Sequence, residues 1–288
     1  MRYLSLDVET ANVDQASICQ IGIVEIVDGT VKTEIDWLID PEDWFDPFNV
    51  SIHGIDESRI ADAGTFPQFH EELSSLLNDT IVVHHTAFDK VAIALVCEKY
   101  GLEPPAAKWL DSARVVRRVF EEFRRSGYGL SNLATQFGLS FKHHDALEDA
   151  RVTAQIMERC LAQSETQIQD WVSLQFKKTS TYSGASSNFK GREGDPEGQF
   201  FGEIAVFTGT LTSMTRAVAA DLAAKEGISS TKGVNAETTM LVVGTQDPKA
   251  LKGASKSSSH RLAEKKIANG QDIKILTEQD FLNLLRLS

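Results

Sequence analysis

Four acidic residues and one histidine in the first half of the chain have the types and spacing that a cation-dependent hydrolytic site requires. They are Asp7, Glu9, Asp89, His144 and Asp149. Successive side chains of a β-strand alternate between its two faces, so Asp7 and Glu9, which flank one residue of an apolar run, point the same way. Paired carboxylates repel each other unless a cation lies between them, and such hard oxygen ligands suit Mg²⁺ or Mn²⁺. The pattern therefore predicts a divalent-cation site that begins on the first strand.

The histidine adds a base to these ligands. Two cations about 3.5–4 Å apart can generate hydroxide and stabilise both the attacking and the leaving oxygen of a phosphodiester. A neutral imidazole can take the proton from the attacking water. The imidazolium that forms then stabilises the negative charge that develops on the phosphate in the transition state. His144 precedes a predicted helix that carries Asp149, so it is the candidate base. His143 lacks this spacing, and we expect it at the surface or behind the ligands.

Each piece alone has a simpler explanation. A pair such as Asp7 and Glu9 usually lies on a solvated strand face, and an acidic residue such as Asp89 at the start of a helix is usually a cap. Against this, Asp7 lies inside an apolar strand, where an unpaired charge is costly. The pieces also occur together in one order along the chain, which favours the hydrolytic site.

Three segments resemble the motifs of the DEDDh 3′–5′ exonucleases, the group of the proofreading subunit of bacterial replicative DNA polymerase and of ribonuclease T. They are the Asp-Val-Glu-Thr run at 7–10, the His-His-Thr-Ala-Phe-Asp run at 84–89, and the run at 144–149 that begins with His and ends with Asp. The resemblance covers residues 1–164. It implies that Asp7, Glu9, Asp89 and Asp149 bind two metal ions and that His144 is the general base.

The same resemblance implies a set of residues that contact the substrate. The run at 51–55 is similar to the His-Gly-Ile segment that lies against the terminal nucleotide in this family. The implied contacts are Thr10, His53, Gly54, Ile55, His85 and Phe88. His85 stands where the family often carries Asn, and either side chain can donate a hydrogen bond. Ile55 and Phe88 are candidates to stack against bases, although a place in the core explains Phe88 equally well.

Composition and charge limit the classes of protein that this chain can be. Its 288 residues, of which 42% are hydrophobic, suffice for two domains. No apolar run approaches the ~20 residues that span a bilayer, and a strand pattern opens the chain, so we expect a cytoplasmic protein without a signal peptide. Cys19, Cys97 and Cys160 are widely spaced and are expected to be reduced thiols.

The charge is concentrated in the first part of the chain. Residues 1–164 carry 14 basic against 27 acidic residues, whereas residues 200–288 carry 11 against 9. A general DNA-coating protein would have a basic surface, so that class is excluded for the first part. An enzyme that gathers carboxylates around cations fits, because bound metals cancel part of the charge.

The order of predicted elements places residues 1–164 in the α/β class, as a mixed sheet with flanking helices. The resemblance to the DEDDh exonucleases implies that this sheet is ribonuclease H-like. An Asp-Gly pair at 28–29 predicts a hairpin between the second and third strands. The expected strands are 3–8, 18–27, 31–39, 80–83 and 109–111. The expected helices are 69–77, 88–100, 113–123, 131–137 and 145–161.

A polar, turn-rich segment predicts a flexible linker at residues 165–199. Residues 200–288 then predict β-α-β-α-β-α with a parallel sheet. The expected strands are 204–207, 240–243 and 273–276, and the expected helices are 215–226, 258–268 and 277–285. Runs at 206–211, 239–244 and 275–282 resemble a BRCT domain of the bacterial DNA ligase type, which implies a small α/β module.

A phosphate site is a further implication of the BRCT resemblance. Such domains hold phosphate with a Thr or Ser and the following Gly after the first strand, together with a Lys at the second helix. Thr208 and Gly209 match, but the Lys position falls near Ser259, and Lys256 is the candidate to replace it. The alternative is that this module binds a protein partner, or binds DNA weakly.

Together these features predict a metal-dependent 3′–5′ exonuclease that releases nucleoside 5′-monophosphates from a single-stranded 3′ end, with DNA as the preferred substrate. It would act in replication proofreading or repair, and the BRCT-like module would tether it to a DNA end or to a replication or repair protein. One alternative is an RNA 3′-end trimming enzyme, because the motifs do not identify the 2′-hydroxyl contacts. The other is a non-catalytic adaptor on a nuclease fold, which predicts a missing ligand, although all five residues are present.

Overall fold

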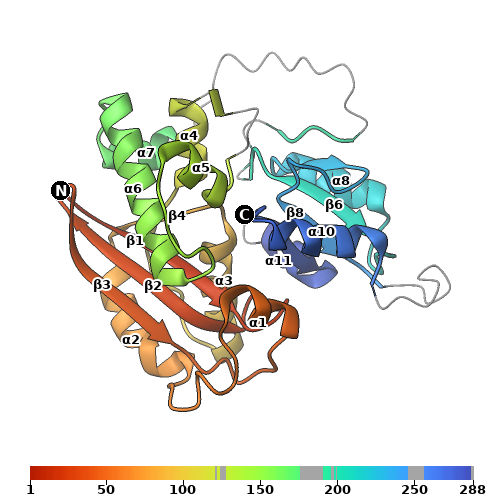
Figure 1. Cartoon of the computed structure of the whole chain (residues 1–288), viewed down its shortest axis with the longest axis horizontal. Helices are drawn as coiled ribbons and strands as arrows, with labels where there is room; N and C mark the ends of the chain where they lie inside the picture. Colours follow the sequence, from red (N-terminus) through yellow and green to blue (C-terminus); the bar gives the residue numbers. More distant parts are fainter. Residues whose placement is uncertain are drawn as a thin grey trace. The chain divides into compact units, whose positions relative to one another are not determined.

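The chain forms two compact units, Met1–Gln175 and Phe176–Ser288. The computed structural model describes residues 1–120, 122–123, 128–175, 191–195, 198, 200–245 and 256–286. Figure 1 shows the helices and strands of both units.

A five-stranded sheet organises the first unit, with the strand order β3-β2-β1-β4-β5. The strands are β1 (Arg2–Thr10), β2 (Ile18–Val27), β3 (Thr30–Leu38), β4 (Ile81–His84) and β5 (Lys108–Asp111). β1, β2 and β3 are antiparallel neighbours, whereas β4 and β5 run parallel to β1. The prediction of a mixed sheet is therefore confirmed, and β1 lies at its centre.

The hairpin between β2 and β3 turns where the sequence predicts it. Asp28 and Gly29 have φ values of 50° and 74°, and such positive values at both central residues fit the type I′ turns that join twisted antiparallel strands. β2 has the predicted bounds. β3 is an exposed edge strand.

Helices cover both faces of this sheet. They are α1 (Pro47–His53), α2 (Phe66–Leu77), α3 (Phe88–Tyr100), α4 (Ser112–Val119), α5 (Leu130–Phe137), α6 (Ala146–Ser164) and α7 (Ile168–Leu174). Leu4, Leu6 and Val8 of β1 pack in one core with α2 and α3, whereas Tyr3 packs in a second core with α4 to α7. Odd-numbered side chains of β1 therefore face α6, and this is the face that Asp7 and Glu9 share.

Within residues 1–164, two helices differ most from the sequence prediction. α1 was not expected, although Asp46 caps it and Pro47 begins it as in many helices. α4 ends at Val119, short of the predicted residue 123. The predicted starts of the other helices lie within three residues of those observed, and α3 has the predicted bounds, with Gly101 as its left-handed C-cap.

The segment predicted as a linker contains ordered structure at both ends. α7 lies within residues 165–199, and Trp171 is only 6% exposed in the core of the first unit. The first unit thus extends to Gln175 rather than to residue 164. Arg192 forms a β-bridge with Ser230 of the second unit. Residues 176–190 of the predicted linker lie outside the described residues.

The second unit is built on a parallel sheet, as predicted, with four strands in the order β7-β6-β8-β9. The strands are β6 (Ile204–Thr208), β7 (Ser229–Thr231), β8 (Met240–Val243) and β9 (Lys274–Thr277). The helices are α8 (Arg216–Lys225), α10 (Ser258–Ala268) and α11 (Glu278–Arg286). The three-residue β7 was missed, because so short a strand leaves no alternating pattern. Thr277 caps α11, since its Oγ1 accepts a hydrogen bond from Asp280 N at 3.1 Å.

Two global properties follow from this structure. Within the described residues, no helix is both long and apolar enough to cross a bilayer. Cys19, Cys97 and Cys160 are all buried and free, so they serve as small core side chains.

Replacement of Trp171 by alanine tests whether α7 belongs to the first unit. The change removes a large side chain from a packed core, and such a truncation costs about 3–5 kcal/mol. We expect the free energy of unfolding to fall by about that amount in urea denaturation of the whole chain. Ser173→Ala, on the exposed side of the same helix, is the matched control. Equal stability of the two variants would contradict the placement of α7.

Candidate active site

Three carboxylates from distant parts of the first unit converge on one point. Asp7 and Glu9 project from β1, and Asp149 lies in the first turn of α6. One oxygen atom from each of the three lies within 4.8 Å of the others. Glu9 and Asp149 are buried, and Asp7 is half-buried. Three anionic groups this close are costly to assemble in a partly desolvated place, and a bound cation offsets that cost.

Asp89 is held beside this group by the backbone of β1. β4 pairs with β1 only as far as Ser5, so the amide of Val8 has no partner from β4. Asp89, which is 1% exposed in the first turn of α3, accepts a hydrogen bond from Val8 N on its Oδ1 at 3.1 Å. The structure thus places Asp89 against the residue between Asp7 and Glu9, although it is not one of the three that converge within 4.8 Å.

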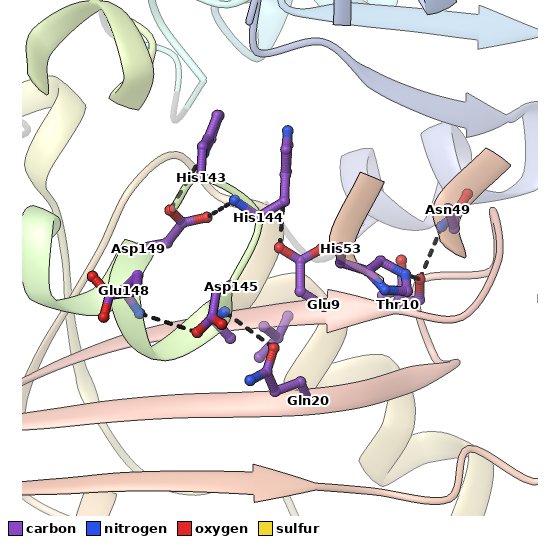
Figure 2. A network of polar contacts seen from close by, with 12 residues as sticks. Glu9, Thr10, Gln20, Asn49, His53, His143, His144, Asp145, Glu148 and Asp149 are labelled. Carbon is purple, nitrogen blue, oxygen red and sulfur yellow. Dashed lines mark hydrogen bonds and ion pairs between the residues drawn. The ribbon is translucent and has the colours of Figure 1, made fainter. Parts of the chain in front are cut away.

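Two histidines flank Asp149 (Figure 2). The backbone N of His144 donates to Asp149 Oδ2 at 3.1 Å, and His144 Nδ1 lies 3.8 Å from Glu9 Oε1. His143 Nδ1 lies 3.3 Å from Asp149 Oδ1, and the two imidazoles stack with their centroids 3.9 Å apart. His143 therefore touches one of the candidate ligands directly, which agrees with its expected place behind the ligands. His144 has a φ of 64°, a strained value for a side chain of its size, and such strain is often retained at functional positions.

The first turn of α6 rests on β2, and this contact carries Asp149 to β1. A Cβ built on Gly22 would lie 2.2 Å from the carbonyl carbon of Ala146, so only glycine fits there. Gln20 Oε1 accepts a hydrogen bond from Ala146 N at 3.1 Å, while its Nε2 donates to Asp36 Oδ1 at 2.8 Å. Sequence reasoning missed both residues, although a glycine inside a strand pattern is a known sign of close backbone approach.

The register of the sheet links these supports to the carboxylates. Gly22 is the antiparallel partner of Asp7, and Gln20 is the partner of Glu9. Asp7 and Glu9 therefore each lie next to a β2 residue that contacts Ala146, the first residue of α6. The N-cap of that helix is Asp145, whose side chain accepts from Glu148 N.

A second hydrogen-bonded group fixes the backbone just after Glu9. Thr10 O accepts from Asn49 Nδ2 at 2.9 Å and lies 3.2 Å from His53 Nε2. Ile55 N donates to His53 Nδ1 at 3.0 Å, so Nε2 carries the proton and donates to Thr10 O. Burial of His53 lowers its pKa to about 4, which keeps the imidazole neutral in this role near pH 7.

The predicted substrate residues divide into exposed and buried positions. Gly54 is exposed, with a φ of 78° that suits glycine. Ile55 is only 2% exposed and packs in a small core, so its side chain does not offer a stacking surface. Phe88 is half-buried and packs against the core with α3, which favours the structural explanation for this residue.

His85 lies in the interior of the first unit. It is 5% exposed, its Nε2 donates to Tyr128 O at 2.8 Å, and its Nδ1 lies 2.8 Å from Ser112 Oγ. Both nitrogens thus contact protein atoms. This placement supports a role in joining β4, α4 and the segment before α5, and it does not support the predicted contact with the nucleotide.

In the second unit, the residues predicted to bind phosphate are Thr208, Gly209 and Lys256, and each contacts other protein groups. Thr208 Oγ1 lies 2.9 Å from Ser257 Oγ, and Gly209 O accepts two hydrogen bonds from Arg216. Lys256 pairs with Glu264. Because a carboxylate already neutralises the Lys256 ammonium, these residues do not present a strong positive field to an anion.

Comparisons with known proteins match the first unit. Residues 4–157 match the family model described as Exonuclease, RNase_T. The chain is 26% identical over 159 residues to the PolC-type DNA polymerase III of Streptococcus pneumoniae, which covers 54% of this chain and 11% of the polymerase. It is 29% identical over 161 residues to that of Thermotoga petrophila, covering 54% and 12%. The match thus spans about a tenth of each polymerase.

Solved structures share the fold. Exonuclease X in complex with 5′ overhanging duplex DNA has a TM-score of 0.51 at 20% identity, covering 60% of this chain and 99% of that one. Escherichia coli Exonuclease I in complex with a dT13 oligonucleotide has a TM-score of 0.50 at 16% identity, covering 57% and 42%.

Replacement of Gly22 by alanine tests how α6 is positioned. The added methyl group must push the first turn of α6 away from β2, which moves Asp149 away from Asp7 and Glu9. We expect hydrolysis to fall about 100-fold or more, since small misplacements of reacting groups have effects of that size. The measurement is kcat/KM for a 5′-labelled oligonucleotide.

Gly233→Ala is the matched control, because an added Cβ there meets no atom within 4 Å. A Gly22→Ala enzyme with the activity of the control would contradict the proposed positioning.

Proposed function

The chain belongs to the exonuclease family whose model matches residues 4–157, and we propose that it removes nucleoside 5′-monophosphates one at a time from the 3′ end of single-stranded DNA. Its first unit is an exonuclease domain of the DEDDh 3′–5′ type. The observation that carries the proposal is the convergence of Asp7, Glu9 and Asp149 within 4.8 Å, with His144 beside Glu9.

The donor set fits divalent metal ions. Carboxylate oxygens are hard ligands, and no thiolate is among them, so Mg²⁺ or Mn²⁺ is the expected choice. Asp7, Glu9 and Asp149 would hold two such ions together with Asp89, whose Oδ1 is oriented by the amide of Val8. When bound, the ions would supply an activated water and stabilise the attacking and leaving oxygens.

His144 would act as the general base. Its Nδ1 faces Glu9 Oε1 at 3.8 Å, which leaves Nε2 to accept the proton of the attacking water. The carboxylate of Glu9 then stabilises the imidazolium that forms. His143 would help to hold Asp149, whose Oδ1 lies 3.3 Å from its Nδ1, so that Asp149 keeps its orientation while His144 changes charge.

The terminal nucleotide would lie against the segment that follows Glu9. Asn49 and His53 fix the carbonyl of Thr10 from behind, which leaves the other side of this backbone for the substrate. Gly54 is exposed and lacks a side chain, so a nucleotide can approach the backbone closely there.

We propose that the second unit gives the enzyme a role on DNA. Its parallel sheet with α8, α10 and α11 supports the BRCT-like identity, and we propose that it tethers the nuclease to a DNA end or to a replication or repair protein. Tethering raises the effective concentration of enzyme at its substrate without new catalytic contacts. Because Lys256 pairs with Glu264, we expect the tether to depend on a surface other than the Thr208 and Gly209 phosphate site.

Digestion of a 5′-labelled single-stranded DNA, with a matched RNA alongside, tests the proposed reaction. Wild type with Mg²⁺ or Mn²⁺ should give a ladder that shortens from the 3′ end, and EDTA should abolish it. Asp7→Ala should reduce the rate by at least about 1,000-fold, because removal of one metal ligand disables the cation pair. His144→Ala should slow hydrolysis about 100-fold or more while metal binding persists.

The control is Asp62→Ala, which removes an exposed carboxylate in the loop before α2. Melting temperatures near that of wild type would show that all variants fold. Wild-type rates in Asp7→Ala or His144→Ala would overturn the assigned roles, and faster digestion of RNA than of DNA would overturn the proposed substrate.

A further inference from the structure

Trp44 is a large apolar side chain that lies exposed at the surface of the first unit. It has 57% of its surface exposed, more than any other large hydrophobic side chain in the part of the chain that the structure describes. An exposed indole forgoes a large gain from burial. A single exposed apolar residue is ordinary, but Trp44 is set apart by where it lies and by how its backbone is held.

Trp44 lies beside the chain segment that leaves the active site. Asn12 Nδ2 donates a hydrogen bond to Trp44 O at 2.8 Å, and Asp46 N donates to Ala11 O at 2.9 Å. Asn12 is the third residue after Glu9, and consecutive Cα atoms are about 3.8 Å apart, so the two Cα atoms lie within about 11 Å. The backbone of Trp44 is therefore held against the segment that directly follows the converging carboxylates.

The backbone around Trp44 is fixed although the ring is exposed. Trp44 N donates to Asp43 Oδ1 at 2.9 Å. Phe45 is 7% exposed and packs in the small core with Ile55. Asp46 caps α1 by accepting from Phe48 N at 2.8 Å. A residue whose backbone is held in place before it binds loses less conformational entropy when a ligand covers it.

The charge around Trp44 selects the part of a nucleic acid that it can contact. Asp40, Glu42, Asp43 and Asp46 surround it in sequence, and Lys99 is turned to the carbonyl of Pro41. This acidic segment repels phosphates. A nucleobase is flat and uncharged, and stacking on an aromatic ring tolerates every base.

We propose that Trp44 stacks on one base of the single strand, upstream of the nucleotide that is being removed. The inference rests on the proposed exonuclease function and adds a substrate contact outside the metal site. The contact holds the strand in register while the terminal nucleotide enters. Because DNA and RNA carry the same kind of ring, it contributes affinity without selecting the sugar.

Steady-state kinetics of Trp44 variants test this contact. Trp44→Ala should raise KM for a single-stranded oligonucleotide about tenfold, in line with the loss of one stacked base, and leave kcat within about twofold of wild type. Trp44→Phe should keep most of the affinity. Val31→Ala, which changes an exposed apolar residue on β3, should behave as wild type.

An abasic site walked through the last few nucleotides should identify the stacked base. At one position, loss of the base should raise the wild-type KM to that of Trp44→Ala, and the variant should lose nothing further. An unchanged KM in Trp44→Ala, or a penalty that is equal at every abasic position, would overturn the proposal.

Fluorescence separates this proposal from the proposed function. Trp37, Trp109 and Trp171 are partly or fully buried, so Trp44 is the tryptophan that a bound base should quench. In EDTA, the oligonucleotide should quench wild type and leave Trp44→Phe unchanged, even if wild type digested no strand at all. Equal quenching of the two proteins would contradict the stacking contact.

Discussion

The first turn of α6 lies directly on the backbone of β2 at Gly22, and the active site depends on this contact. Any side chain at position 22 would overlap Ala146, and Gln20 adds a hydrogen bond to the same residue. The contact brings Asp149 to within 4.8 Å of Asp7 and Glu9. The first turn of a helix also stabilises negative charge through its dipole and its free amides, which reduces the cost of placing a third carboxylate there.

The end of β1 gathers the remaining groups because its neighbour strand stops early. β4 leaves β1 after Ser5, and Asp89 takes the amide of Val8 that the parallel strand does not reach. Beyond this point, Asn49 and His53 hold Thr10, and Asn12 holds the loop of Trp44. One strand end thus positions the carboxylates, the expected place of the terminal nucleotide and the proposed stacking ring.

Local patterns in the sequence predicted most of the elements. α3 and α10 have their predicted bounds, because helical periodicity marks a helix and a glycine shortly after its last residue, Gly101 or Gly270, marks its end. The alternation of β1 placed Asp7 and Glu9 on one face. Local patterns could not predict the contacts that hold the site in place, since Gln20 and Ala146 are 126 positions apart in the sequence. Similarity to a family motif also does not reveal burial, so Ile55 and His85 were expected to touch substrate although the structure buries both.

The central claim is that the docking of α6 on β2 completes a divalent-cation site. Calorimetric titration of Mn²⁺ into wild type, Asp149→Asn and the control Asp62→Ala tests it without reference to any substrate. Saturable binding by wild type and the control, weakened about tenfold or more in Asp149→Asn, is the result that this account predicts. Undetectable binding by wild type, or equal affinities in wild type and Asp149→Asn, would contradict it.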